Sequence, residues 1–361
     1  MKMLLNIWAG EEEKRRQKNY TKGSDILTIY FFLFIIIAAT SCNSTENNVP
    51  RTFLVKSNNT PTEVGVVQTP KPLFYKFTAD VLMKDYLDTI SRLAERFDTL
   101  LDYTLDEHSI VHSNPWLLDS LIATDYYSKK EEGIIVKDIL SWVIIHEGDS
   151  LIIPDSLNSN IIQKKIASIK LDINIPEYRL RIIIGDTALF SIPIRVGRPV
   201  WKYLAMVDKK VNLMTKTGKG KIVKIDKNPT YINPADNRIY KMTRRDDGII
   251  TQLPRIPWME PELGEIRHGQ WIHPTTNKNT LEKAYSNGCI GVSEGDMWRI
   301  YYHSKIGTPI TIRYDLEVND ENGERKILKN IYPSMKRSIA QIVPVIPGKT
   351  VDVPVPLCSC M

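Results

Sequence analysis

The chain has 361 residues, enough for about two domains, and its 42% hydrophobic and 25% charged residues are typical of a globular protein. Its formal net charge of +6 comes from scattered charges of both signs, with no basic stripe that carries interleaved aromatic residues. This pattern argues against nucleic acid as a partner and is compatible with an anionic polymer or a membrane surface.

The N-terminal segment predicts export. Residues 1–25 are polar and partly basic, and residues 26–39 are almost purely apolar. Such a stretch is too short to cross a bilayer comfortably, since a spanning helix needs about 20 residues, but it has the layout of a secretory signal. Residues 39–42, Ala-Thr-Ser-Cys, resemble the lipobox of bacterial lipoproteins. The resemblance implies removal of residues 1–41 and lipidation of Cys42, with a short membrane anchor and an incidental cysteine as the alternative.

Residues 43–70 are rich in Asn, Thr, Ser and Pro, which predicts a flexible tether. Residues 71–170 predict a mixed α/β region. Part of it has apolar residues at the three- and four-residue steps of an amphipathic helix: Phe77, Val81, Leu82, Tyr86, Leu87, Ile90, Leu93 and Phe97. Residues 142–154 predict a strand, a tight turn and a second strand. This segment faintly resembles part of a LysM glycan-binding module, which leaves glycan binding open beside a packing or positioning role.

Two histidines in this region, His108 and His112, stand four residues apart and could share one face of a helix as metal ligands. No third ligand follows at a useful spacing. We therefore expect surface or packing histidines rather than a metal site.

From residue 171 the chain consists of short strands separated by Pro and Gly, a pattern that predicts an all-β sandwich or barrel. Residues 178–196 predict a hairpin that turns at Gly185-Asp186. Further strands are expected near residues 220–225, 271–273 and 308–314. Residues 317–361 form a C-terminal extension with another hairpin and a proline-rich tail.

The chain has four cysteines, Cys42, Cys289, Cys358 and Cys360. Cys358 and Cys360 lie too close together for an easy disulfide with each other. Cys289 is thus the lone thiol of a foldable domain in an exported protein, where free thiols are at risk of oxidation. It is either a buried structural thiol or a functional one.

The residues around Cys289 favour the functional interpretation. His268 and His273 precede it, and a nearby imidazole can take the proton of a thiol. Gly288 permits a sharp turn of the backbone, and backbone N–H groups at such a turn can stabilise an oxyanion. These residues alone support acyl transfer.

The order of these residues is similar to the signature of the L,D-transpeptidase family. That signature is His-Gly-Thr, a spacer, and Ser-His-Gly-Cys followed by an aliphatic residue and usually Arg. Here His273-Pro274-Thr275 is followed by Ser286-Asn287-Gly288-Cys289-Ile290, with twelve residues between His273 and Ser286. The resemblance extends over roughly residues 175–316 and includes residues 193–197, 215–222 and 293–312.

The resemblance implies a mainly β protein, with an L,D-transpeptidase-type β-sandwich catalytic domain at residues 171–316 and a smaller, partly helical N-terminal region. It implies that Cys289 attacks a peptidoglycan tetrapeptide stem, with His273 as general base and acid. D-Alanine leaves, and the thioester passes to an amine acceptor. The N–H groups of Gly288 and Cys289 are the expected oxyanion donors, and Ser286 and Asn287 are expected to shape the site. No metal or cofactor is implied.

Three positions depart from the signature: Pro274 replaces a glycine, Asn287 the second histidine and Gly291 the arginine. Because Gly291 carries no charge, the way in which the site holds substrate carboxylates stays open. Water as acceptor, giving an L,D-carboxypeptidase, and a catalytically silent wall-binding module remain alternatives.

His268 is a rival base, because Gly269 follows it. It lacks the following threonine and the twelve-residue spacer, so His273 is favoured. A papain-like hydrolase would place its histidine after the cysteine, where this chain has only His303.

Overall fold

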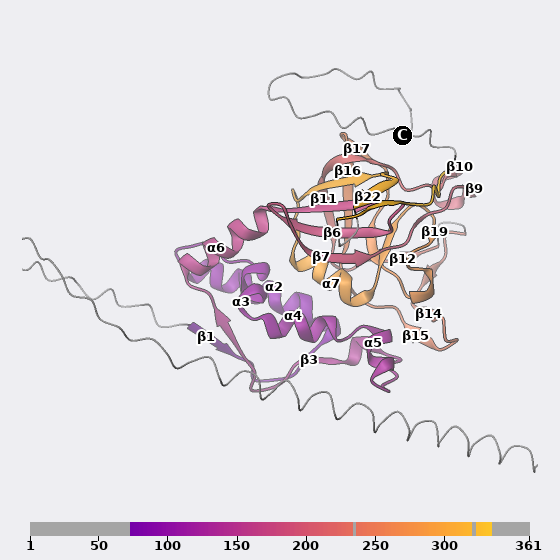
Figure 1. Cartoon of the computed structure of the whole chain (residues 1–361). Coiled ribbons are helices and arrows are strands. Elements are labelled where there is room, and N and C mark those ends of the chain that lie inside the picture. Colours follow the sequence, from indigo (N-terminus) through magenta and orange to yellow (C-terminus); the bar gives the residue numbers. More distant parts are fainter. Residues whose placement is uncertain (1–72, 234–235, 320–322, 334–361) are drawn as a thin grey trace, which may run out of the picture. The chain divides into compact units, whose positions relative to one another are not determined.

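The computed structural model describes residues 73–233, 236–319 and 323–333 (Figure 1). The chain divides into two units, residues 1–67 and 68–361, and all described residues belong to the second. The predicted signal peptide, the lipidation site Cys42, the whole tether and most of the proline-rich tail lie outside the described residues. Within those ranges, no helix combines the length and apolar character needed to cross a membrane.

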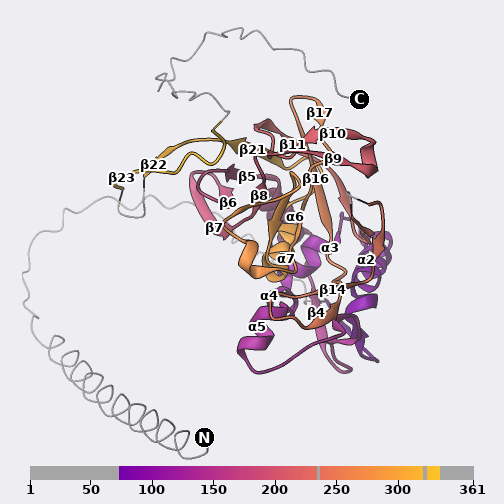
Figure 2. The same ribbon diagram turned by 90° about the vertical axis from the view of Figure 1, so that its right-hand side faces the viewer.

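A nine-stranded sheet forms the centre of the second unit (Figures 1 and 2). Eight strands follow one another in the order β20-β18-β16-β11-β21-β5-β6-β7. The ninth, β17, pairs with β16 and stands outside this order. The strands are β5 (Ile169–Asn174), β6 (Arg179–Ile184), β7 (Thr187–Pro193), β11 (Gly218–Asp226), β16 (Trp258–Leu263), β17 (Ile266–Arg267), β18 (Ile272–Pro274), β20 (Ile290–Val292) and β21 (Pro309–Arg313). The β5–β21 and β18–β20 pairs are parallel, and the others are antiparallel.

The sheet follows from alternating apolar residues. Leu180 and Ile182 of β6 are fully buried, and Leu171 and Ile173 of β5 are buried opposite them. Gly185 turns the chain between β6 and β7 with a φ of 57°, a conformation that glycine adopts without strain. The predicted hairpin over residues 178–196 is therefore confirmed, as are strands close to residues 220–225, 271–273 and 308–314.

Short strand pairs surround the main sheet. They are β1 (Leu73–Lys76) with β4 (Ser150–Ile153), β2 (Val81–Leu82) with β3 (Val143–Ile145), β8 (Val196–Gly197) with β19 (Ala284–Ser286), β9 (Trp201–Leu204) with β10 (Lys209–Asn212), β12 (Tyr231–Ile232) with β13 (Ile239–Tyr240), β14 (Met242–Arg244) with β15 (Ile250–Gln252), and β22 (Glu317–Asn319) with β23 (Arg325–Ile327). The predicted strands of residues 142–154 are present as β3 and β4. They do not pair with each other, because each takes a partner from residues 73–82.

The helices are α2 (Met83–Leu100), α3 (Glu107–Ser113), α4 (Pro115–Ile122), α5 (Tyr126–Glu131), α6 (Ser156–Ala167) and α7 (Glu294–Tyr302), with short 3-10 turns at Ile139–Ser141, Ala205–Val207 and Lys278–Thr280. The predicted amphipathic helix is confirmed from residue 83, and its buried stripe includes Tyr86, Leu87, Ile90 and Leu93. The prediction began too early, because Phe77 lies beyond β1 and residues 81–82 form β2. A mainly β fold with a smaller, partly helical N-terminal region is thus confirmed.

The N-terminal helices pack on α7, which lies against α4 in both views (Figures 1 and 2). The hydroxyls of Tyr86 in α2 and Tyr302 in α7 are 2.8 Å apart, and both side chains are fully buried. His108 donates from Nε2 to the carbonyl of Tyr301 at 3.2 Å, and His112 donates to that of Tyr302 at 2.7 Å. Both histidines are therefore packing residues, as expected. They join the N-terminal region to α7.

Candidate active site

Cys289 directly precedes β20, which lies parallel to β18. Ile272 pairs with Ile290, and His273 pairs with Gly291. Side chains alternate between the two faces of a sheet, and the fully buried Ile272 and Ile290 point into the core. Cys289, Gly291 and His273 therefore share the opposite face. The predicted base lies on β18, and the predicted nucleophile directly precedes the neighbouring β20, two residues before the partner of His273.

A tight turn presents Cys289. Gly288 has a φ of 115°, and a Cβ at this position would lie 3.1 Å from Nε2 of Gln270. The hydroxyl of Ser286 donates to the Cys289 carbonyl at 2.6 Å and accepts from the Gly288 N–H at 3.2 Å. The backbone conformation favours glycine before the cysteine.

Two residues outside the signature hold this turn. Thr215 donates to the Gly288 carbonyl at 2.9 Å and accepts from the Gly197 N–H at 2.8 Å. The Tyr332 hydroxyl donates to the Gly197 carbonyl at 2.7 Å and accepts from the Thr215 N–H at 3.2 Å. Thr215 and Tyr332 are both fully buried. Tyr332 belongs to the C-terminal extension, and no signal in the sequence connects it with the site.

The Cys289 thiol is protonated at rest. Burial raises its pKa above the ordinary value. The backbone N–H of Trp271 donates to Sγ at 3.5 Å and lowers the pKa, as does the positive charge of Arg195. Because burial outweighs these effects, a base would have to take the thiol proton before Cys289 could act as a nucleophile.

His273 is neutral, because burial and the charge of Arg195 lower its pKa to about 3. Its Nδ1 donates to the Pro274 carbonyl at 2.9 Å, which fixes the proton on Nδ1 and leaves Nε2 as the basic nitrogen. The ring lies beside Trp258, with ring centroids 4.9 Å apart. His273 is thus held in the tautomer that can accept a proton.

Asn287 stands where the signature has its second histidine. Its Oδ1 accepts from Nη2 of Arg198 at 2.6 Å, and the Arg198 N–H donates to the Ser286 carbonyl at 3.1 Å. The Arg198 guanidinium also lies 6.0 Å from the centroid of the Tyr285 ring. Arg198 therefore fixes the side-chain oxygen of Asn287 and leaves its amide hydrogens as donors.

Arg195 was missed in the sequence. Its backbone N–H donates to the Gly291 carbonyl at 2.8 Å, and its carbonyl accepts from the Gly291 N–H at 3.0 Å. A Cβ on Gly291 would lie 2.4 Å from Nε of Arg195. The side chain of Arg195 therefore occupies the place beside Gly291, and the site contains a guanidinium although no arginine follows Ile290.

The rival base His268 lies on an exposed segment after β17. It is not on the strand that pairs with β20, whereas His273 is. Within the described ranges, no group of three or more His, Cys, Asp and Glu side chains could hold a metal ion.

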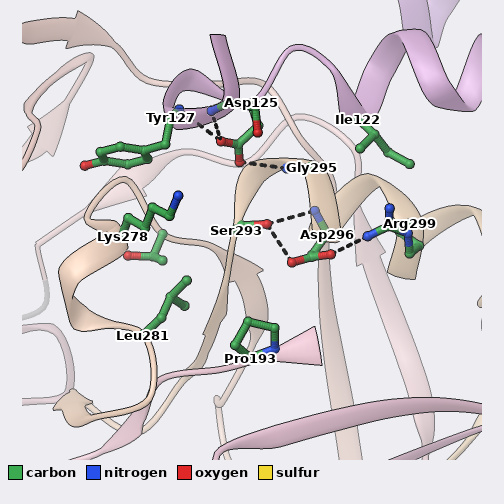
Figure 3. A pocket seen from close by; sticks show the side chains of 12 residues that line it. Ile122, Asp125, Tyr127, Pro193, Lys278, Leu281, Ser293, Gly295, Asp296 and Arg299 are labelled. Atoms are coloured by element: carbon green, nitrogen blue, oxygen red, sulfur yellow. Dashed lines mark hydrogen bonds and ion pairs between the residues drawn. The ribbon is translucent and has the colours of Figure 1, made fainter. Parts of the chain in front are cut away.

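A cavity of about 320 Å³ lies beside the first turn of α7 (Figure 3). Its lining includes Asp125, Asp296 and Arg299 but neither Cys289 nor His273. Within this lining, Asp125 accepts from the Gly295 N–H at 3.1 Å, and Asp296 pairs with Arg299 at 2.5 Å, whereas Lys278 pairs with Glu131 outside it. Thr275, two residues after His273, also lines the cavity, which therefore adjoins the candidate active site without containing the thiol or the imidazole.

Residues 168–312 match the model of the YkuD family, the L,D-transpeptidase catalytic domain. This part of the chain has the L,D-transpeptidase fold. The resemblance of the sequence to this domain is therefore confirmed. No curated protein matches the chain significantly.

Several solved L,D-transpeptidases are similar to the chain. One from Mycobacterium smegmatis is 14% identical, with a TM-score of 0.29, and the match covers 41% of this chain and 59% of that one. One from Xylanimonas cellulosilytica is 12% identical, with a TM-score of 0.30, and the match covers 68% and 100%. One from Mycobacterium tuberculosis is 16% identical, with a TM-score of 0.26, and the match covers 40% and 57%. The chain thus spans less than two thirds of the M. smegmatis protein.

Proposed function

We propose that this protein is an L,D-transpeptidase that acts on peptidoglycan tetrapeptide stems in cell wall biogenesis. One observation carries the proposal: Cys289 and a neutral His273 lie on one face of the β18–β20 pair, within the segment that matches the catalytic domain. Nucleophilic acyl transfer needs a thiol and a neutral imidazole that can take its proton.

In the acylation step, Nε2 of His273 takes the thiol proton and Sγ of Cys289 attacks the carbonyl that joins the third stem residue to D-alanine. The tetrahedral intermediate collapses, the carbon–nitrogen bond breaks, and the leaving amine takes the proton from His273. The product is a thioester on Cys289 and free D-alanine. In the second step, an amine attacks the thioester, and the thiol recovers its proton through His273.

The oxyanion of each intermediate would be held by backbone N–H groups at the turn. The Cys289 N–H has no acceptor within the described part of the chain and is therefore available. The Gly288 N–H, the second expected donor, donates to Ser286 and would have to exchange that partner. Ser286 and Asn287 would shape the walls of the site.

The acceptor is proposed to be the side-chain amine of a second stem, which gives a 3→3 cross-link. If water were the acceptor, the same thioester would yield a tripeptide, and the protein would act as an L,D-carboxypeptidase. A catalytically silent wall-binding module is the other alternative, motivated by Pro274, Asn287 and Gly291.

We also propose that the protein is a lipoprotein, exported and anchored to a bacterial membrane through Cys42, with its catalytic domain facing the periplasm or cell wall. The support is the sequence of residues 26–42, with its apolar stretch and terminal Ala-Thr-Ser-Cys. The proposed partners are peptidoglycan stem peptides and the membrane, and nucleic acid is not expected.

Exposure to a carbapenem, followed by mass spectrometry of the intact protein and its peptides, tests the nucleophile. The predicted result is a covalent adduct on the Cys289 peptide that is absent from the Cys289→Ala variant. Cys42, Cys358 and Cys360 serve as internal controls, because their peptides should carry no carbapenem adduct. A folded wild-type protein without an adduct would instead support the silent module.

A further inference from the structure

Four residues that can influence the reaction lie on one face of the sheet. Arg195 pairs antiparallel with Gly291, and His273 pairs with Gly291 from the other side. Residues directly opposite in such pairs point to the same face. Cys289 stands two residues before Gly291 and shares this face. Arg195 and His273 therefore lie on either side of Gly291, close to the thiol.

Gly291 is required by the close approach of Arg195. A Cβ at position 291 would lie 2.4 Å from Nε, 2.7 Å from Cγ and 2.9 Å from Cδ of Arg195. The φ of Gly291 is not positive, so the backbone conformation does not explain the glycine. Loss of the side chain at position 291 is what lets the Arg195 side chain cross this strand.

The Arg195 guanidinium has few partners. Its Nε is buried without a hydrogen-bond partner, and its Nη1 donates to Oγ1 of Thr280 at a long 3.3 Å. Within the described ranges, no carboxylate forms an ion pair with it. A desolvated donor of a cation without a countercharge is unfavourable, so the Nε end of Arg195 lacks the anion that would compensate its burial.

Cys289 can supply that anion. Burial lowers the pKa of Arg195, and Cys289 is the first of the groups that raise it, ahead of Tyr285 and Asp246. In return, Arg195 lowers the pKa of the Cys289 thiol. A substrate carboxylate is a poorer candidate for the unpartnered Nε, because that atom is inaccessible from solvent.

We propose that Arg195 is a positioning residue that holds the negative charge of the Cys289 thiolate from across the strand, in place of the arginine that the signature has at position 291. The inference rests on the proposed function only in taking Cys289 as the nucleophile. When His273 removes the thiol proton, the sulfur becomes the anion that the Arg195 guanidinium, with its unpartnered Nε, lacks. Burial, with a further contribution from Arg195, keeps His273 neutral, so the base is ready before the thiolate forms.

The test is the pH dependence of alkylation of Cys289 by iodoacetamide in the full chain, followed by mass spectrometry of the Cys289 peptide. Arg195→Gln should move the midpoint upward by about one pH unit, equivalent to about tenfold less thiolate at a given pH below it. Arg195→Lys should retain most of the wild-type profile, because it keeps the charge. Gly291→Ala should shift the profile in the same direction as Arg195→Gln, because its Cβ displaces Nε.

Arg325→Gln is the matched control, because it removes the same charge from the exposed β22–β23 hairpin. Its profile should coincide with that of the wild type. The proposal is overturned if folded Arg195→Gln also has a pH profile that coincides with that of the wild type. If Arg195→Gln does not fold, a wild-type profile for folded Gly291→Ala overturns it. Alkylation needs no stem peptide, so the expected shifts together with inactivity toward muropeptides would refute the proposed function and leave the role of Arg195 intact.

Discussion

His273 and Cys289 are both neutral at rest, and this state determines how the site responds to pH. Burial and Arg195 lower the pKa of His273 to about 3, and burial raises that of Cys289. The base is therefore unprotonated at every pH at which the protein would work. In the proposed mechanism, the ionisation that controls the rate is therefore that of the Cys289 thiol.

We predict that the rate of acylation by a carbapenem rises continuously from about pH 5 to about pH 9, without a step near the ordinary histidine pKa of 6.5. The rate should be measured by mass spectrometry under single-turnover conditions. His273→Gln should lower it by about 10²- to 10⁴-fold, the usual contribution of a general base. An acidic limb with a midpoint near 6.5 in the wild type would show that His273 titrates normally and would contradict this account.

At this scale, the sequence predicts the residues that stand within the signature. Cys289, His273 and the turn at residues 286–288 follow from motif and spacing. Arg195 could not be predicted, because its side chain enters the site through a strand pairing with Gly291 that joins residues nearly one hundred positions apart. Tyr332 reaches the turn only through tertiary packing.

Among the secondary-structure elements, α7 ends at a contact between two histidine rings. His303 caps its C-terminus, and the His303 ring lies 5.0 Å from that of His112 in α3. Burial lowers the pKa of His303 to about 4 and lowers those of His112 and His108. The contact between α3 and α7 is thus built with neutral histidines.

This contact predicts a loss of stability in mild acid. Above the unfolded pKa of 6.5, His303 is neutral in both states and has no effect. Between pH 6.5 and about 4, the unfolded chain binds the proton of His303 more tightly than the folded chain does. The free energy of unfolding therefore decreases as the pH is lowered through this range, by about 3 kcal/mol for His303 alone. As the pH is lowered from 6.5 to about 4, the melting temperature of the wild type should decrease, and that of His303→Gln should decrease less. Equal pH dependence of the two proteins would contradict the assignment.

Elements with local patterns could be predicted, and elements with distant partners could not. The β6–β7 hairpin and α2 follow from alternation and helical periodicity within one segment. The strands β3 and β4 were predicted as neighbours, but their partners lie some 60 to 80 residues earlier in the chain. The sequence of a strand specifies which of its faces is buried, but its pairing partner is determined by the tertiary fold.

For the second unit as a whole, the N-terminal region supports the catalytic domain through α7. The fully buried side chains of Tyr86 and Trp298 meet edge to face, with centroids 5.9 Å apart. The hydroxyl contact between Tyr86 and Tyr302 adds a buried polar link. We infer that the N-terminal region completes the core around α7, a role for which the sequence offered only the amphipathic pattern of α2.

The most direct measurement of the central claim is the product analysis of tetrapeptide muropeptides incubated with the protein. We predict cross-linked dimers together with released D-alanine, and neither product with Cys289→Ala. Tripeptides without dimers would identify water as the acceptor and keep Cys289 as the nucleophile. Unchanged substrate with a folded wild-type protein would contradict the proposal that this chain is an L,D-transpeptidase.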